Sequence, residues 1–250
     1  MSVLFVASST QYFTLPNNMA FTQNIAGFTA FCIIRPSSIP SSGNEVRVFA
    51  ISNNTGVGTS RVTITHRNDG SGGFMRAFSR RLDGDGGETA DTNPAATGAI
   101  NANTTYSIAI VCDWAGGFLG AYIDGRLEAS VSPGSWTGNS SNTVSLFSAI
   151  GARGDGGQPF DGLIENMMWW PAALPLHAIR ALHVNNGALS NARTLAGNVD
   201  AYFWPMRGTL PAPPSIIVEI WKRGGFDGSQ VNSPTYNVHL GVEPAPIHAQ

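Results

Sequence analysis

The acidic residues of this chain do not occur at the spacing that glycoside hydrolysis needs. That reaction uses two carboxyl groups placed on either side of the scissile bond. Glu165 is the acid that we expect on a strand beside a groove, and its nearest acidic neighbour, Asp161, precedes it by four residues. Four residues of strand span about 13 Å, which is too far for a retaining pair. We therefore interpret Glu165 as a hydrogen-bonded structural residue. Of the three functions that the sequence raises, hydrolysis of glycosides is the least favoured, after the two that follow from the C-terminal arm.

The histidines do not indicate nucleophilic or metal chemistry either. No Gly-x-Ser-x-Gly motif accompanies them, and this motif marks the nucleophile of one large class of serine hydrolases. His177 and His183 are six residues apart, so they lie on different faces of a predicted helix and do not form a two-histidine metal site. The others are scattered over a strand end and the tail, at His66, His239 and His248. We predict that the protein is not an enzyme.

Tryptophan side chains are the candidates for binding a sugar, because the apolar face of a sugar packs on an indole ring. Trp114 and Trp136 lie in or beside predicted loops, and loop Asn and Asp side chains would complete such a platform. The alternative is packing in the core or at an interface. For the adjacent pair Trp169 and Trp170, the alternation of a strand predicts one ring in the core and the other under the helix or at an interface.

The elements that position these residues are almost all strands. Residues 145–152 and 162–170 read as strands joined by the turn Gly154-Asp155-Gly156-Gly157. Residues 28–34 and 106–112 are apolar on both faces, which is typical of central strands. After Pro175, apolar residues recur at helical spacing up to Asn185-Asn186-Gly187, which predicts one short helix. We expect this helix to cover the open end of a sandwich.

Three blocks of sequence carry a resemblance to a known family. They are an opening pair of strands over residues 8–36, a central hairpin with the turn Tyr122-Ile123-Asp124-Gly125, and the segment IGARGDGGQPFDGLIENMMWWPAALP. In this order they resemble the laminin-G-like and pentraxin-like domains of the concanavalin-A-like jelly-roll superfamily. The resemblance implies an all-β fold, a two-sheet antiparallel jelly-roll sandwich with one short helix. We assign residues 1–207 to this domain and residues 208–250 to an extended, Pro/Gly-rich C-terminal arm.

The same resemblance raises calcium as a cofactor, because members of this superfamily often bind it through loop acids and carbonyl oxygens. Loop acids of that type are Asp83, Asp85 and Asp155. No EF-hand loop is present, and Asp-Gly pairs are commonly simple turns. The prediction is therefore no cofactor, with calcium as the alternative.

Composition excludes several classes of partner. Charged residues make up 12% of the chain and the net charge is −2, with Lys222 the one lysine. No basic field is available to hold a nucleic-acid backbone or a membrane surface. Such a neutral, hydrogen-bonding surface suits packing against another protein or against sugars.

The two cysteines indicate a reducing compartment. Cys32 and Cys112 lie within apolar strands, and the amino terminus carries no recognisable secretory signal. We expect both to be buried free thiols, and the alternative is a disulfide between them. A protein made without export and then incorporated into a particle fits this expectation.

The C-terminal arm decides between two functions. Its apolar residues are too many to sit in water and predict an interface, namely Ile216, Ile217, Val218, Ile220 and Trp221. The sequence from Tyr202 onward resembles tails that follow such domains in tailed-bacteriophage proteins. The first interpretation is a non-enzymatic virion structural protein of a tailed bacteriophage, namely a capsid decoration or cement protein or a tail accessory. Such a protein would be located in the virion and would self-associate or bind the major capsid protein or another virion protein. The alternative is a stand-alone carbohydrate-binding, lectin-like module that recognises surface glycans.

Overall fold

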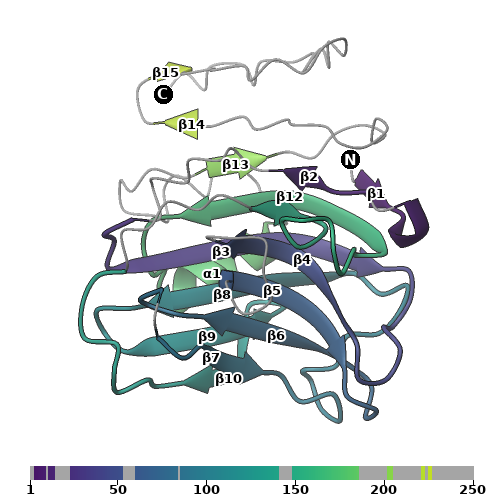
Figure 1. The fold of residues 1–250 in the computed structure, drawn as a ribbon, viewed down its shortest axis with the longest axis horizontal. Coiled ribbons are helices and arrows are strands. Elements are labelled where there is room, and N and C mark those ends of the chain that lie inside the picture. The colour runs from purple at the N-terminus through teal and green to yellow at the C-terminus, as the bar shows by residue number, and fades with distance from the viewer. Residues whose placement is uncertain are drawn as a thin grey trace.

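The computed structural model describes residues 3–9, 11–14, 23–52, 60–83, 85–140, 148–185, 202–204, 221–222 and 225–226. Within these residues, two antiparallel sheets lie face to face (Figure 1). A short 3-10 helix covers Ala7–Ser9, and a separate hairpin joins β14 (Trp221–Lys222) to β15 (Gly225–Phe226). The fold is a jelly-roll sandwich with one short α-helix, as the sequence predicts.

The larger sheet contains seven described strands. Its order is β1 (Val3–Phe5), β12 (Gly162–Trp170), β3 (Gly27–Pro36), β8 (Tyr106–Asp113), β9 (Phe118–Ile123) and β10 (Arg126–Val131), and β13 (Tyr202–Trp204) also pairs with β12. The expected central hairpin is present. Asp124 and Gly125 connect β9 to β10 with φ angles of 50° and 74°, the left-handed conformation that a two-residue hairpin turn requires.

The smaller sheet contains six described strands, and its outer face carries a row of polar side chains. Its order is β2 (Phe13–Thr14), β11 (Ala149–Ile150), β4 (Glu45–Ser52), β5 (Ser60–Asn68), β6 (Gly73–Ser79) and β7 (Glu88–Asp91). Val62 and Ile64 of β5 and Met75 of β6 face the other sheet. Thr63, Thr65 and Arg76, which lie at the alternate positions of the same strands, face away from the core.

The core between the sheets is rich in aromatic rings. Phe49 of β4 lies at its centre, because its ring stacks on Phe28 at 6.3 Å and on Trp169 at 6.0 Å. Trp114 also packs against Phe28, with 6.5 Å between the ring centroids. Aromatic pairs at these distances add to the free energy gained by burying their surface. The prediction that one of Trp169 and Trp170 lies in the core is confirmed.

The helix α1 (Leu176–Val184) corrects one expectation. It covers the outer face of the seven-stranded sheet rather than the open end of the sandwich (Figure 1). Ala178, Ile179 and Leu182 form an apolar cluster with outward-facing residues of four strands, which include Phe31, Val111, Tyr122, Met168 and Trp170. This explains why β3, β8 and the end of β12 are apolar on both faces: one face meets the other sheet and the other meets the helix.

The prediction of two buried free thiols is confirmed. Cys32 and Cys112 are fully buried and unpaired with one another. Burial raises the pKa of Cys112 to about 12 and raises the pKa of Cys32 further, so both behave as small apolar side chains. Separately, no helix in the described ranges has the length and apolarity to cross a membrane.

Candidate functional site

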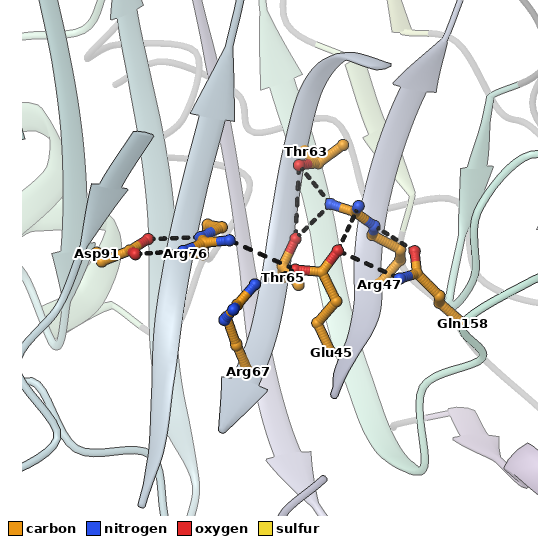
Figure 2. A network of polar contacts seen from close by, with 8 residues as sticks. All are labelled: Glu45, Arg47, Thr63, Thr65, Arg67, Arg76, Asp91 and Gln158. Carbon is orange, nitrogen blue, oxygen red and sulfur yellow. Dashed lines mark hydrogen bonds and ion pairs between the residues drawn. The ribbon is translucent and has the colours of Figure 1, made fainter. Parts of the chain in front are cut away.

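A row of polar side chains crosses the outer face of the six-stranded sheet. Arg47 on β4 pairs with Thr65 on β5, Thr65 pairs with Arg76 on β6, and Arg76 pairs with Asp91 on β7. Residues paired across antiparallel strands point to the same side of the sheet. Together with neighbours from the same face and one loop they form what we call the polar network (Figure 2): Glu45, Arg47, Thr63, Thr65, Arg67, Arg76, Asp91 and Gln158.

All three side-chain nitrogens of Arg47 donate hydrogen bonds within this network. Its Nη1 donates to the Oγ1 atoms of Thr63 at 2.9 Å and Thr65 at 2.7 Å, and its Nε donates to Gln158 Oε1 at 2.9 Å. Its Nη2 donates to Glu45 Oε1 at 2.7 Å. Burial lowers the pKa of Arg47, and the carboxylate of Glu45 partly offsets this effect. The side chain is therefore fixed in position and covers the two fully buried threonines.

Glu45 connects three arginines. Its Oε1 also accepts a hydrogen bond from Gln158 Nε2 at 3.2 Å. Its Oε2 lies 3.3 Å from Arg67 Nη1 and 3.8 Å from Arg76 Nη1. One carboxylate thus holds guanidinium groups from β4, β5 and β6 side by side (Figure 2).

Arg76 and Asp91 form a bidentate pair at the more exposed end of the row. Arg76 Nε donates to Asp91 Oδ1 at 2.7 Å, and Arg76 Nη2 donates to Asp91 Oδ2 at 2.5 Å. These hydrogen bonds raise the pKa of Arg76. The Asp91 side chain is 35% exposed, more than any other charged group of the network. The network therefore presents prepositioned donors and acceptors on a sheet surface, with both carboxylates held by guanidinium groups.

The expected sugar platform on Trp114 and Trp136 is wrong. Their exposed fractions are 0% and 1%, and both belong to the core between the sheets. Trp114 Nε1 donates to Ser79 Oγ at 3.1 Å from within that core. The segments that carry these residues turn the indole rings inward, so neither ring has a face free for a sugar.

The three predicted calcium ligands do not form one site. Asp83 pairs with the buried Arg61, and Asp155 accepts two hydrogen bonds from Arg153, which lower its pKa. Asp85 accepts a hydrogen bond from the backbone N–H of Leu82 at 3.1 Å. Across the described ranges, no three His, Cys, Asp or Glu side chains lie together as a metal site would require. Asp83 and Asp155 bind guanidinium groups, so the expectation that these three acids together hold calcium is wrong.

One cluster has the residue types of a serine hydrolase but not its geometry. Ser107 Oγ lies 2.9 Å from His183 Nδ1, and Asp124 Oδ1 lies 3.9 Å from the same nitrogen. A catalytic triad uses the two different ring nitrogens for its serine and its aspartate. Asp124 Oδ1 also accepts from the Ser107 N–H at 2.9 Å. The cluster therefore ties the end of α1 to the seven-stranded sheet.

Two further sequence predictions concern Glu165 and the arm. Glu165 lies partly exposed on β12 opposite Ile33 of β3, and Asp161 in the preceding loop accepts from Ser38 Oγ at 3.3 Å. The predicted interface residues Ile216, Ile217, Val218 and Ile220 lie outside the described residues. Trp221 is described in its backbone alone, as part of β14. The interface therefore stays a prediction.

A two-sheet antiparallel sandwich with a helix packed on the outer face of one sheet and the polar network on the outer face of the other is a jelly-roll β-sandwich domain. A family model described as the concanavalin A-like lectin/glucanases superfamily, of the laminin G type, matches residues 7–180. The chain belongs to this superfamily. No match was found among curated protein sequences.

Solved structures show the same fold at low sequence identity. A heptameric SAP-like pentraxin from Limulus polyphemus has a TM-score of 0.54 and 14% identity, covering 74% of this chain and 82% of the other. The CBM40 of the IT-sialidase from Ruminococcus gnavus, bound to α2,3-sialyllactose, has a TM-score of 0.50 and 18% identity over 64% and 84%. The intramolecular trans-sialidase of a leech has a TM-score of 0.53 and 19% identity over 71% of this chain and 26% of that protein.

Proposed function

We propose that this domain is a carbohydrate-binding module that binds glycans on the outer face of its six-stranded sheet. The observation that carries the proposal is the polar network, which aligns side chains from four adjacent strands in one row. The similarity to a carbohydrate-binding module that was solved with a sialyllactose ligand supports it. Low overall charge and a hydrogen-bonding surface are compatible with the same role.

The chemistry of a sugar matches this face. Each hydroxyl group both donates and accepts a hydrogen bond, and the network offers guanidinium donors beside carboxylate acceptors. Arg47, Gln158 and the two threonines hold Glu45 in place before any ligand arrives. A site whose side chains are already ordered loses less conformational entropy on binding.

In this proposal the domain binds a glycan but does not hydrolyse it. Both carboxylates of the network are bonded to arginines, and the Ser107–His183–Asp124 cluster lacks the geometry of a triad. Incubation with the bound glycan should release no reducing ends, with Glu165→Gln as a comparison variant. Release by the unmodified protein but not by that variant would contradict a purely binding role.

The first prediction tests whether the outer face of the six-stranded sheet binds the glycan. Screening of an oligosaccharide array should find a ligand, and titration calorimetry should then show that Arg76→Gln lowers its affinity by about tenfold or more, because a charge-assisted hydrogen bond is lost and Asp91 is left unpaired. The matched control is Arg126→Gln, which removes an exposed arginine on β10 of the other sheet.

Thermal unfolding of both variants establishes that they are folded. An Arg76→Gln protein that is folded and binds as tightly as the unmodified chain would show that this face is not the binding site. An array without any bound glycan would contradict the function as a whole.

A virion structural role is the second candidate, and the apolar segment Ile216–Trp221 favours it. We predict that truncation after Arg207 leaves a folded sandwich but abolishes self-association or binding to purified capsids, because burial of this segment would contribute about 25 cal/mol per Å² of apolar surface. Size-exclusion chromatography and capsid co-sedimentation measure the two effects. A truncated protein that assembles and binds like the full chain would rule out the arm as an interface.

A further inference from the structure

We infer that the glycan bound by the polar network is uncharged, and that Arg67 and Asp91 are the two side chains that contact its hydroxyl groups. This inference rests on the proposed function and names the ligand class for the same site. It follows from two observations, the hydrogen-bonding capacity that members of the network leave unused and the balance of charges once the charged neighbours of the network are counted.

Unused hydrogen-bonding capacity is concentrated at Arg67 and Asp91. A guanidinium group has five N–H donors, and Arg67 makes one contact in the network, with Glu45 at 3.3 Å. A carboxylate has about four acceptor positions, and Asp91 receives two hydrogen bonds there, both from Arg76. These side chains are 27% and 35% exposed, whereas Arg47 is 13% exposed and its guanidinium nitrogens are all engaged. Arg47 is therefore a positioning residue.

Arg67 and Asp91 belong to one continuous surface. Arg67 and Arg76 lie 3.3 and 3.8 Å from the same oxygen of Glu45, and Arg76 is bonded directly to Asp91. Figure 2 shows these side chains along one stretch of the sheet face. A hydroxyl-bearing ligand laid across it accepts hydrogen bonds at the Arg67 end and donates them at the Asp91 end.

The charges around this surface cancel. Asp69 is close enough to interact electrostatically with Arg67 and Arg76, and Arg153 with Arg47. Counting these neighbours and the partner of Arg153, four arginines face four acids: Arg47, Arg67, Arg76 and Arg153 against Glu45, Asp69, Asp91 and Asp155. The formal net charge of the surface is zero.

A balanced surface disfavours an ionic ligand. An anion at Arg67 would also lie near the carboxylates of Glu45 and Asp69, and a cation at Asp91 would lie near Arg76. Either ion would exchange its hydration for a site that carries no net charge to compensate it. A neutral sugar needs no counter-charge. The ligand class inferred here therefore differs from the acidic sialyllactose present in the similar carbohydrate-binding module.

The experiment compares neutral and acidic glycans built on the same backbone. Three arms are immobilised on one array: neutral oligosaccharides that include lactose, the same backbones capped with sialic acid, and the same backbones carrying sulfate. We expect the protein to prefer the neutral arm. Its affinity should change by less than about twofold between about 0.05 and about 0.5 M NaCl, because salt screens charge interactions but not neutral hydrogen bonds.

The two contact residues are tested with variants that replace each charged group by a neutral amide. Arg67→Gln and Asp91→Asn should each lower affinity for the neutral ligand by about tenfold, while Arg180→Gln, at an exposed position of α1, should leave it unchanged. Thermal unfolding checks that each variant is folded. Folded Arg67→Gln and Asp91→Asn proteins with unchanged affinity would overturn the assignment of the contacts.

The outcomes separate this inference from the proposed function. Preference for the sialylated or sulfated arm, with affinity that falls steeply with salt, would overturn the neutral ligand class and leave glycan binding intact. Absence of binding in all three arms would overturn both.

Discussion

At the scale of single residues, buried polar groups distinguish this core from a purely apolar one. His66 faces inward on β5 and is 2% exposed. Gly73 on β6 makes room for it, because a Cβ atom there would lie 2.6 Å from His66 Nε2 and 2.2 Å from the carbonyl oxygen of Ile100. Burial lowers the pKa of His66 to about 4, and the nearby Ile100 backbone opposes this shift to a smaller extent.

The third prediction follows from this pKa. The unfolded chain has an ordinary histidine, so between about pH 6.5 and pH 4 it binds a proton that the folded protein does not bind. The contribution of His66 to the free energy of unfolding is fully present above pH 6.5. It decreases on acidification, by up to about 3 kcal/mol at pH 4. Urea unfolding of the unmodified protein and of His66→Gln at about pH 7 and about pH 4.5 measures it.

Comparison with the variant is necessary because carboxylates titrate in the same range. We expect the free energy of unfolding to fall less with acidification in His66→Gln than in the unmodified chain. Equal pH dependence of the two proteins would show that His66 does not stay neutral in the fold.

At the scale of elements, α1 is held mainly by what it packs on. Its N-cap residue, Pro175, makes no side-chain capping bond, and the helix is nine residues long. Helices this short are marginal in isolation. The apolar cluster beneath Ala178, Ile179 and Leu182 and the hydrogen bond between Ser107 and His183 supply the missing stability.

The fourth prediction concerns that hydrogen bond. Ser107→Ala should lower the free energy of unfolding by about 1 kcal/mol, because it removes the partner of His183 Nδ1 near the end of the helix. Hydrogen exchange of the backbone amides of α1 should become faster, while exchange in β5 and β6 stays unchanged. The control is Ser130→Ala at an exposed position of β10. Unaltered exchange in α1 would mean that apolar packing alone holds the helix.

At the scale of the whole molecule, the sequence predicts the sandwich better than the site. Alternation of apolar residues, the Asp124-Gly125 turn and the two-sided apolar strands are local signals, and they identify the fold. The direction of a side chain in a loop is not local. Trp114, Trp136, Asp83 and Asp155 therefore look available in the sequence although the fold buries the two rings and pairs the two acids with arginines.

The polar network was missed for a related reason. Arg47, Thr65, Arg76 and Asp91 are each unremarkable in their own strand, and their alignment depends on the register between four strands. Register is set by pairings between distant parts of the chain. A partial signal does exist, because Glu45-x-Arg47 and Thr63-x-Thr65-x-Arg67 place polar residues at alternate positions of two strands, with apolar Val46 and Ile64 between them.

The register shift in β4 has a consequence for how such a domain can change over time. Val48 is the extra residue between Arg47 and Phe49, and both Val48 and Phe49 face the core. The bulge separates the strand into a half that carries Glu45 and Arg47 on the outer face and a half that anchors the aromatic core. Under the proposed function, substitutions in the first half change the residues of the binding face, while the second half keeps its core residues. A lineage of such domains is thus free to acquire new ligands by changing a few outward positions, while the interior that specifies the fold is inherited intact.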